Sequence, residues 1–159
     1  DADGLNIISK SYKWWDRLPE QSILTPHVGE MSRLTRLSVE QIQSDRLGVV
    51  QAYARKWRKV VVLKGANTLV GEPDGTVWIS GVANPALASA GTGDVLSGII
   101  LGLASQGLGL ADSAVLGVYV HGAAAGVISD RTGPSGLLAS DIVLELPNVV
   151  SFLRNNCSD

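Results

Sequence analysis

The stretch that decides the fold is Asn84-Pro85-Ala86-Leu87-Ala88-Ser89-Ala90-Gly91-Thr92-Gly93-Asp94-Val95-Leu96-Ser97-Gly98. It has the pattern of a loop, a glycine-rich turn and an uncharged helix. Gly91 and Gly93 allow backbone angles that other residues avoid, so the amides of the turn can point inward together. The first N–H groups of a helix have no partner inside it and carry the positive end of its dipole. The turn therefore predicts an anion pocket formed by Ala90, Gly91, Thr92 and Gly93.

Asp94 is the candidate catalytic residue. It follows the predicted anion pocket directly, where a carboxylate could accept a proton from a substrate hydroxyl. A simpler interpretation is that Thr92 or Asp94 only caps the helix. Capping alone requires neither the pair Asn84-Pro85, nor the run of small residues after it, nor two turn glycines. The longer pattern therefore favours a functional site.

Composition restricts the class of protein. The chain has 159 residues, of which 18% are charged and 45% apolar, and its formal net charge is −2. This balance is typical of one water-soluble globular domain with a substantial core. Because Lys and Arg are scattered rather than gathered in a stripe, we expect no nucleic-acid partner. The single cysteine, Cys157, cannot form an internal disulfide and has no companion metal ligands, which fits a reducing, cytoplasmic compartment.

Two long segments, residues 95–111 and 113–129, carry no acidic or basic side chain. Polar and small residues dilute both segments, and neither has a basic flank. We therefore expect buried core helices rather than membrane spans. The acidic beginning of the chain, with no apolar segment after it, is unlike a signal peptide.

The remaining pattern alternates strands with helices, which predicts a three-layer α/β domain. Ser38 and Gln41 form a capping-box pattern at the start of a predicted helix, and Pro147 predicts a kink or restart in the last helix. We expect strands at 22–25, 60–63, 68–71 and 76–80; helices at 11–16, 38–58, 94–105, 111–129 and 140–155; a helical turn at 29–34; and the end of a strand with its loop at 1–6.

The helix after the glycine turn has no polar face between Val95 and Leu103, which predicts a central position in the core. Gly98 and Gly102 share one face of this helix, and the next helix also carries several small residues. We expect these two helices to approach closely and to hold the glycine turn rigid. The small residues of the second helix are Gly117, Gly122, Ala125 and Gly126.

The chain resembles the ribokinase-like superfamily, and in particular the ADP- or ATP-dependent NAD(P)H-hydrate dehydratases with their carbohydrate-kinase-like domain. The stretch 84–98 carries the first match, and the other blocks follow the family's order over nearly the whole chain. These blocks are Asp1-Ala2-Asp3-Gly4-Leu5-Asn6, Thr25-Pro26-His27-Val28-Gly29-Glu30-Met31, Lys64-Gly65-Ala66-Asn67-Thr68, His121-Gly122-Ala123-Ala124 and Leu138-Ala139-Ser140-Asp141.

The resemblance implies a three-layer ribokinase-like α/β fold. The family's domain is longer, and the first match here is its mid-domain Asp-Ala-Asp block. Residues 1–159 are therefore expected to form the C-terminal part of a single domain that lacks its N-terminal portion. We expect an exposed strand edge and exposed apolar surface, covered by a homo-oligomer or by the missing piece.

The resemblance also implies an activity, namely the nucleotide-dependent dehydration of hydrated NADH or NADPH. Asp94 would accept the proton of the substrate hydroxyl, the hydroxyl would take a phosphoryl group from ADP or ATP, and phosphate would then leave. The amides of residues 90–93 would stabilise the moving phosphoryl group, and Mg²⁺ would accompany the nucleotide. No metal site made of protein ligands alone is expected.

Further site residues follow from the resemblance alone. The nucleotide would contact Lys64, Gly65, Ala66, Asn67, Thr68 and Gly93. The hydrated substrate would contact His27 and Asp94. Asp3, Asn6 and Asn84 match loops near the family's cleft, and Glu30 is either a first-turn acid or a water-mediated contact to Mg²⁺. The family often has His or Pro where this chain has Asn67, which leaves the role of Asn67 open.

Two alternatives remain at this point. The chain could be a small-molecule kinase of the same superfamily, of the hydroxymethylpyrimidine or thiazole type, because these kinases share the Gly-x-Gly-Asp turn. It could also be an inactive, truncated domain that binds nucleotide or assembles with a partner. His121 lies on an apolar helix and is expected to be a core residue with its hydrogen bonds satisfied.

Overall fold

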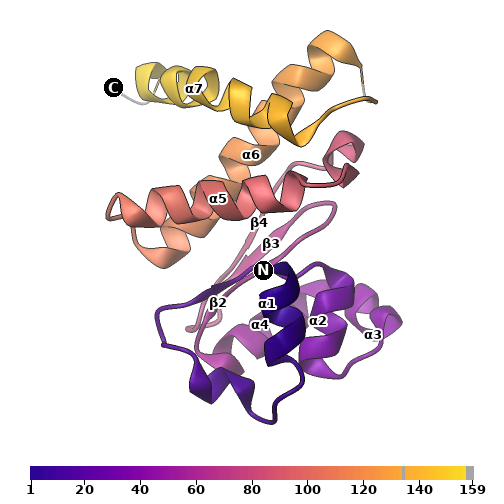
Figure 1. The fold of residues 1–159 in the computed structure, drawn as a ribbon. Helices are drawn as coiled ribbons and strands as arrows, with labels where there is room; N and C mark the ends of the chain where they lie inside the picture. Colours follow the sequence, from indigo (N-terminus) through magenta and orange to yellow (C-terminus); the bar gives the residue numbers. More distant parts are fainter. Residues whose placement is uncertain (134, 157–159) are drawn as a thin grey trace.

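A mixed four-stranded sheet forms the centre of the molecule (Figure 1). The computed structural model describes residues 1–133 and 135–156. Strand β1 (Ile23–Leu24) runs parallel to β2 (Val60–Leu63), and β3 (Leu69–Gly71) and β4 (Val77–Ile79) follow as antiparallel neighbours in the order β1-β2-β3-β4. The turn at residues 72–75 joins β3 to β4. All four predicted strands are confirmed.

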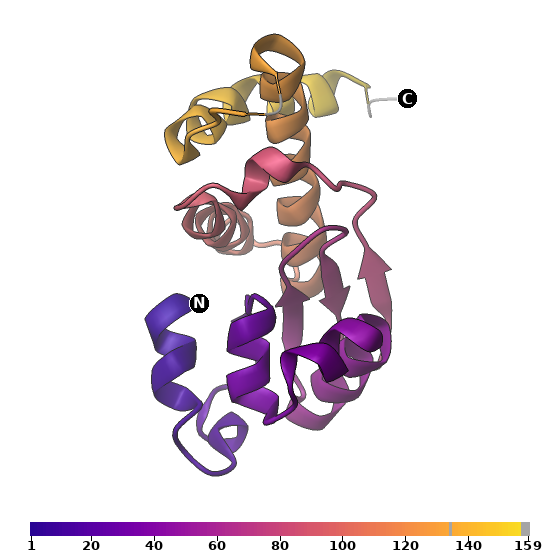
Figure 2. The same ribbon diagram turned by 90° about the vertical axis from the view of Figure 1, so that its right-hand side faces the viewer.

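Strand β2 explains the layered arrangement. All four of its residues are buried. Val61 and Leu63 pack into the core on one face of the sheet, whereas Val60 and Val62 pack into a separate core on the other face. Successive side chains of a strand point to opposite faces, so a continuous apolar run requires cover on both sides. Helices supply that cover on each face (Figure 2).

The first helical layer contains α1 (Ala2–Ile8), the 3₁₀ turn η1 (Trp14–Arg17), α2 (Val28–Thr35), α3 (Val39–Ser44) and α4 (Arg46–Trp57). Buried residues from all of these elements, among them Met31, Ile42 and Trp57, share one core with Val61. Residues 2–8 are helical, so the prediction of a strand end and loop at 1–6 is wrong. The carboxylate of Asp1 caps this helix by accepting the N–H of Ala2 at 2.9 Å.

The predicted single helix at 38–58 is two helices. The capping box of Ser38 and Gln41 is present as predicted. Asp45 then leaves the helical backbone conformation, and its side chain accepts the N–H of Gly48 at 2.8 Å. This second cap starts α4 at Arg46, and an acid that caps a new helix inside an amphipathic pattern explains the break.

The second helical layer contains the 3₁₀ turn η2 (Pro85–Ala88), α5 (Thr92–Ser105), α6 (Leu110–Thr132) and α7 (Ala139–Asn156). Helices α5 and α6 cover the second face of the sheet, and α7 packs on them at the far side from the sheet (Figure 1). Helix α7 continues through Pro147, so the predicted restart does not occur. Helix α6 is long and apolar enough to cross a membrane, but 56% of its most apolar window is buried within the protein.

The predicted packing of glycines between α5 and α6 is wrong in detail. A side chain on Gly98, Gly102 or Gly126 would meet open space. The close approach occurs at Gly117, where a Cβ atom would lie 2.6 Å from Cγ1 of Ile100. Leu101 is 70% exposed, so α5 is not central in the described residues. Its apolar pattern gives no polar face; Leu96 and Ile100 pack in the core with strand and α6 residues, whereas Leu101 is exposed.

A candidate nucleotide-binding site

One pocket of about 320 Å³ brings together segments that are far apart in the sequence. It lies between the loop after β2, the segment that leads into α5, and helix α6. The loop after β2 contributes residues 64–66 and 68 to its lining. The segment from β4 to α5 contributes residues 80, 82–85, 87–88, 92–93 and 96, and α6 contributes residues 118 and 121–122. The predicted nucleotide-binding loop and the predicted anion turn therefore form parts of one pocket wall. Asn67, Ala90, Gly91 and Asp94 are outside this lining.

The glycine turn leaves the start of α5 open. Gly91 has φ +83°, a left-handed conformation that favours glycine, and α5 begins after it without any side-chain cap. The hydroxyl of Thr92 donates instead to the carbonyl oxygens of Leu87 and Ser89, at 2.7 and 2.8 Å. The simpler capping interpretation is therefore wrong. In the described part of the chain, the amides of Gly93 and Asp94 have no acceptor.

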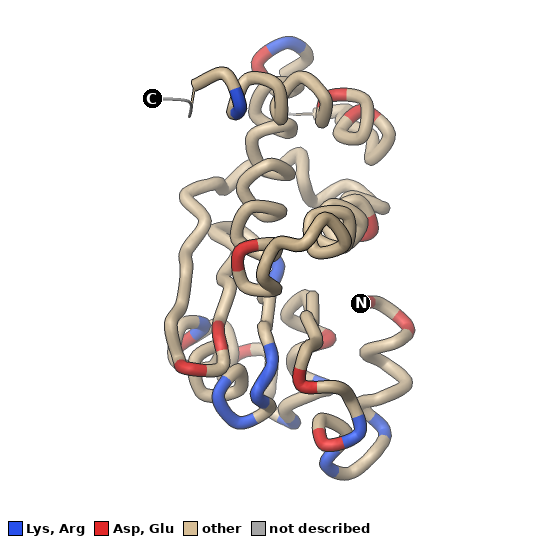
Figure 3. The backbone as a smooth tube through the Cα atoms, turned by 90° about the vertical axis from the view of Figure 1, so that its left-hand side faces the viewer, with Lys and Arg blue, Asp and Glu red and all other residues tan. Residues whose placement is uncertain are grey.

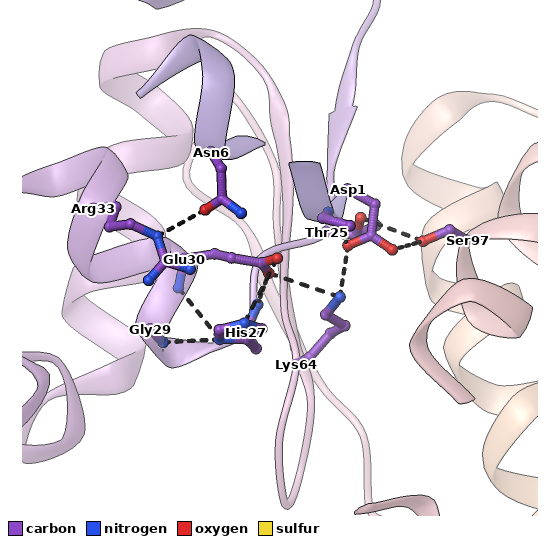
Figure 4. Close-up of polar contacts among 10 residues, drawn as sticks. Asp1, Asn6, Thr25, His27, Gly29, Glu30, Arg33, Lys64 and Ser97 are labelled. Atoms are coloured by element: carbon purple, nitrogen blue, oxygen red, sulfur yellow. Dashed lines mark hydrogen bonds and ion pairs between the residues drawn. The ribbon is translucent and has the colours of Figure 1, made fainter. Parts of the chain in front are cut away.

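The ammonium of Lys64 lies between the carboxylates of Asp1 and Glu30 (Figure 4). Its Nζ lies 2.6 Å from Oδ1 of Asp1 and 3.8 Å from Oε2 of Glu30. A Cβ atom on Gly93 would be 3.3 Å from the same Nζ, so the absence of a side chain lets the ammonium approach the turn. Burial lowers the pKa of Lys64, and the negative charges of Glu30 and Asp94 oppose that shift.

Asp94 is exposed on the first turn of α5. No hydrogen bond to its carboxylate is found among the described residues. Its charge nevertheless acts on Lys64, whose pKa it raises. This arrangement leaves a carboxylate free beside a cation and two open amides, which is what a general base next to a phosphoryl group requires.

The sequence analysis missed two polar residues near Lys64, namely Asp1 and Ser97. Oδ2 of Asp1 accepts the hydroxyl of Ser97 at 2.6 Å, and the same hydroxyl lies 3.4 Å from that of Thr25 (Figure 4). Asp1 thus joins Lys64 to helix α5. Asp3, which the resemblance indicated, is exposed on α1 and outside this network. The spacing of Ser97 from Asp94, one helical turn, was the only signal that could have pointed to it.

Asn6 lies on α1, and His27 and Glu30 lie at the start of α2. Asn6 accepts Nε–H of Arg33 at 2.7 Å. The ring of His27 accepts the N–H groups of Gly29 and Glu30, at 3.0 and 3.2 Å, and Oε2 of Glu30 accepts the N–H of His27 at 2.7 Å. His27 and Glu30 therefore form the capping box of α2. Glu30 serves as the predicted first-turn acid, and its carboxylate is already occupied.

Asn84 and His121 attach the turn to α6. Asn84 caps η2 and donates to the hydroxyl of Ser129 at 2.9 Å. Nε2 of His121 lies 2.9 Å from the carbonyl oxygen of Thr92. His121 is buried and hydrogen-bonded, as predicted, and burial lowers its pKa against the opposing effect of this hydrogen bond. Its contact with the glycine turn was not predicted, because the two residues are 29 positions apart.

The described residues contain no group of three or more His, Cys, Asp or Glu side chains that could hold a metal ion. Cys157 lies outside the described residues. Any divalent cation here would depend on ligands from a bound molecule as well as on protein carboxylates.

Comparison with protein families gives the same picture as the geometry. The family model for NAD(P)H-hydrate dehydratase matches residues 1–148. The chain belongs to the NAD(P)H-hydrate dehydratase family. The match includes the loop at 64–68, the turn at 90–93 and Asp94.

Relatives of known name agree with this assignment. The chain is 44% identical over 154 residues to the bifunctional NAD(P)H-hydrate repair enzyme Nnr of Moorella thermoacetica, which covers 97% of this chain and 29% of that protein. It is 43% identical over 145 residues to the ADP-dependent (S)-NAD(P)H-hydrate dehydratase of Neisseria meningitidis. This match covers 89% of this chain and 49% of that protein. The chain thus spans less than a third of the first relative and about half of the second.

Solved structures of this family have the same fold. The ADP/ATP-dependent NAD(P)H-hydrate dehydratase of Bacillus subtilis, co-crystallized with ATP/Mg²⁺, is similar with a TM-score of 0.80 and 37% identity, covering 82% of this chain and 47% of that one. A ribokinase-like superfamily protein of Enterococcus faecalis is similar with a TM-score of 0.74 and 28% identity. This match covers 92% of this chain and 49% of that one. The predicted ribokinase-like α/β fold is therefore confirmed.

Proposed function

We propose that the protein containing this chain repairs hydrated NADH or NADPH by a dehydration that consumes ADP or ATP. The observation that carries the proposal is a single one. Residues 64–66 and 68 of the loop and residues 92–93 at the uncapped start of α5 line one pocket, and the free carboxylate of Asp94, next in the chain, acts on the charge of Lys64. The names of the Neisseria and Bacillus relatives support this substrate and this nucleotide dependence.

In the proposed complex, the nucleotide lies against the loop at 64–68 and its terminal phosphoryl group faces α5. The open amides of Gly93 and Asp94 and the ammonium of Lys64 act on the phosphate oxygens. These donors are fixed before the reaction, since Thr92, His121 and Asp1 hold the turn and the lysine in place. Preorganised donors lower the cost of charge that develops on the moving phosphoryl group.

Asp94 is the proposed general base. It removes the proton from the hydroxyl of the hydrated nicotinamide ring, and the hydroxyl oxygen forms a bond to the terminal phosphorus. The bond between that phosphorus and the bridging oxygen of the nucleotide breaks. Phosphate then leaves the ring with the electron pair of its C–O bond, a neighbouring C–H proton is lost, and the ring double bond is restored. The hydroxyl oxygen leaves with the phosphate.

Mg²⁺ fits this site as a companion of the nucleotide. Mg²⁺ commonly uses one or two carboxylates together with substrate phosphates and water. Of the two carboxylates whose charges act on Lys64, Asp94 has no hydrogen bond among the described residues, whereas Glu30 is occupied by its cap and by Lys64. When bound, the cation would neutralise charge on the phosphates. The substrate role of His27, whose side chain is 54% exposed, also remains part of this proposal.

The test is an assay of the full-length natural protein with hydrated NADH and either ADP or ATP. Recovery of NADH with one phosphate released for each NADH is the expected result. A small-molecule kinase would instead transfer phosphate to a pyrimidine or thiazole alcohol without releasing it. Nucleotide binding without any turnover would favour the inactive alternative. Either of these results would contradict the proposal.

Cytoplasmic location and self-association complete the proposal. Several apolar side chains of the second layer are exposed, including Leu101, Leu144 at 77% and Phe152 at 66%. Exposed apolar side chains of this size favour association with another surface. Measurement of the solution mass of the full-length protein tests this part, and a monomer at all concentrations would contradict it.

A further inference from the structure

The loop at residues 64–68 holds an unusual backbone conformation. Gly65 has φ +144° and Asn67 has φ +50°. Two hydrogen bonds fix the ends of the loop, from the N–H of Lys64 to the carbonyl of Pro26 at 2.9 Å and from the N–H of Asn67 to that of Val82 at 3.2 Å. A loop with left-handed residues persists only where its surroundings hold it.

Arg46 supplies much of that support from behind the loop. It is the first residue of α4 and does not line the pocket. Its Nη1 donates to the carbonyl of Ala66 at 2.6 Å, and its Nη2 donates to that of Leu63 at 3.4 Å. The two carbonyl groups therefore point toward the guanidinium of Arg46, which is not part of the pocket lining.

The contact between Arg46 and the loop leaves no spare room. A Cβ atom on Gly65 would lie 3.1 Å from Nη2 of Arg46. Burial lowers the pKa of Arg46, and its Nε is buried without a partner in the described residues. Such burial of a cation is costly unless its remaining donors are used. A planar guanidinium reaches two carbonyls at once, which an ammonium cannot do with the same geometry.

We propose that Arg46 is the positioning residue of the nucleotide loop. By holding the carbonyls of Leu63 and Ala66 on the side of α4, it keeps the loop in the one conformation that forms the pocket wall. This inference rests on the proposed function, since it assigns the loop to nucleotide binding.

Helix α4 also carries a matched control. Nε of Arg55 donates to the carbonyl of Asp74 at 3.1 Å, in the turn between β3 and β4. A Cβ atom on Gly75, which has φ +96°, would lie 2.0 Å from that Nε. Arg55 therefore supports a glycine turn in the same manner as Arg46, but its turn is absent from the pocket lining.

The experiment compares Arg46→Ala, Arg46→Lys and Arg55→Ala in the full-length natural protein. Calorimetry gives the Kd for ADP, steady-state kinetics give KM and kcat, and hydrogen exchange follows the amides of Asn67 and Gly75. Loss of two hydrogen bonds of ordinary strength corresponds to roughly a thirtyfold change in affinity. We expect Arg46→Ala to raise the Kd and the nucleotide KM by about that factor, with a smaller change in kcat.

The other two variants sharpen the result. Arg46→Lys keeps one donor and should fall between wild type and Arg46→Ala. Arg55→Ala should speed exchange at Gly75 and leave the Kd for ADP unchanged. If Arg46→Ala does not fold, Arg46→Lys alone decides, because its Kd must rise while its circular dichroism stays that of wild type.

The outcomes separate the two proposals. A wild-type protein that binds neither ADP nor ATP would overturn the proposed function, and exchange at Asn67 would still decide whether Arg46 holds the loop. Wild-type ADP binding with an unchanged Kd in both Arg46 variants would overturn the inference about Arg46 alone. An equal rise of the Kd for ADP in Arg55→Ala would also overturn the inference about Arg46. Weaker binding in Arg46→Ala would then reflect a general loss of stability.

Discussion

The helices on the two faces of the sheet begin in different ways. In the first layer, α2, α3 and α4 each start with a side-chain cap, from His27, Ser38 and Asp45. In the second layer, α5 and α6 start after Gly91 and Gly109 with no side-chain cap. Charged residues follow the same division: they gather in the first layer and are sparse on α5 and α6 (Figure 3).

Under the proposed function, the difference separates a scaffold from a binding surface. Each side-chain cap satisfies one or two of the amides at a helix start, so the first layer presents fewer free donors there. The start of α5 has no side-chain cap, and the proposed function assigns its amides to a ligand. Helix α6 shows that an uncapped start alone does not make a binding site, because its first turn is absent from the pocket lining. Its own acid, Asp112, also folds back toward the helix start, where a Cβ atom added to Gly109 would lie 3.2 Å from Oδ2 of Asp112. What distinguishes α5 is its position beside Lys64 and the pocket.

The strongest way to break this comparison is Asp94→Asn with Asp112→Asn as its control. Both acids are exposed and occupy the third position of an uncapped helix. Asp94→Asn removes the proposed base, so turnover should fall by roughly 10²-fold or more. Asp112→Asn should leave turnover unchanged, and thermal unfolding should be similar for both. Near-normal turnover in Asp94→Asn would contradict the role of the carboxylate.

A second way is to strain the turn itself with Gly91→Ala. Gly91 has φ +83°, and a Cβ atom there would lie 3.2 Å from Cβ of Ala139. An alanine in this conformation costs about 1–2 kcal/mol, so both the free energy of unfolding and the affinity for ADP should fall.

Gly98→Ala is the control for Gly91→Ala, because its new methyl group meets open space within the helix α5. It should raise the free energy of unfolding by about 0.5–1 kcal/mol and leave ADP binding intact. Denaturant unfolding and calorimetry measure both quantities. Equal ADP affinity in the two glycine variants would show that the turn does not shape the site.

Loss of a helix cap in the first layer should lower the free energy of unfolding without changing the affinity for ADP. Ser38→Ala removes a cap, so the free energy of unfolding should fall by about 1 kcal/mol. The Kd for ADP should remain that of wild type, because Ser38 lies outside the pocket. A clear loss of ADP affinity would mean that the first layer is more than a scaffold.

The smallest expected effect concerns pH and His121. Burial lowers the pKa of His121 below its ordinary value of 6.5. The unfolded chain therefore takes up a proton as the pH falls through about 6.5, while the folded chain resists it, and stability is lost in that direction. In His121→Asn the free energy of unfolding should fall less between about pH 7.5 and about pH 5.5 than in wild type. An unchanged pH dependence would contradict the burial of a neutral ring.

Local patterns predicted most of the fold. The apolar run 60–63, the turn at 72–75 and the capping box of Ser38 each depend on near neighbours, and all are confirmed. The errors arose where distant contacts decide. Asp45 starts a new helix, and Leu101 of the apolar helix α5 is exposed. Spacing along a single chain cannot reveal which faces of a helix will be covered.

The candidate site divides in the same way. Sequence motifs indicated the loop at 64–68 and the turn at 90–93, and the structure brings parts of both to one pocket. The contacts of Asp1 with Ser97, of His121 with Thr92 and of Arg46 with the loop join residues far apart in the chain. No local pattern encodes these pairs, so only the folded arrangement could show them.

The most direct test of the central claim is a crystal structure of the full-length natural protein with ADP. The claim is that the uncapped start of α5 binds the phosphates of a nucleotide held by the loop at 64–68. The predicted result is a phosphate oxygen within hydrogen-bonding distance of the amides of Gly93 and Asp94, with the rest of the nucleotide against residues 64–68. Density for ADP at another place, with this turn empty, would contradict the account.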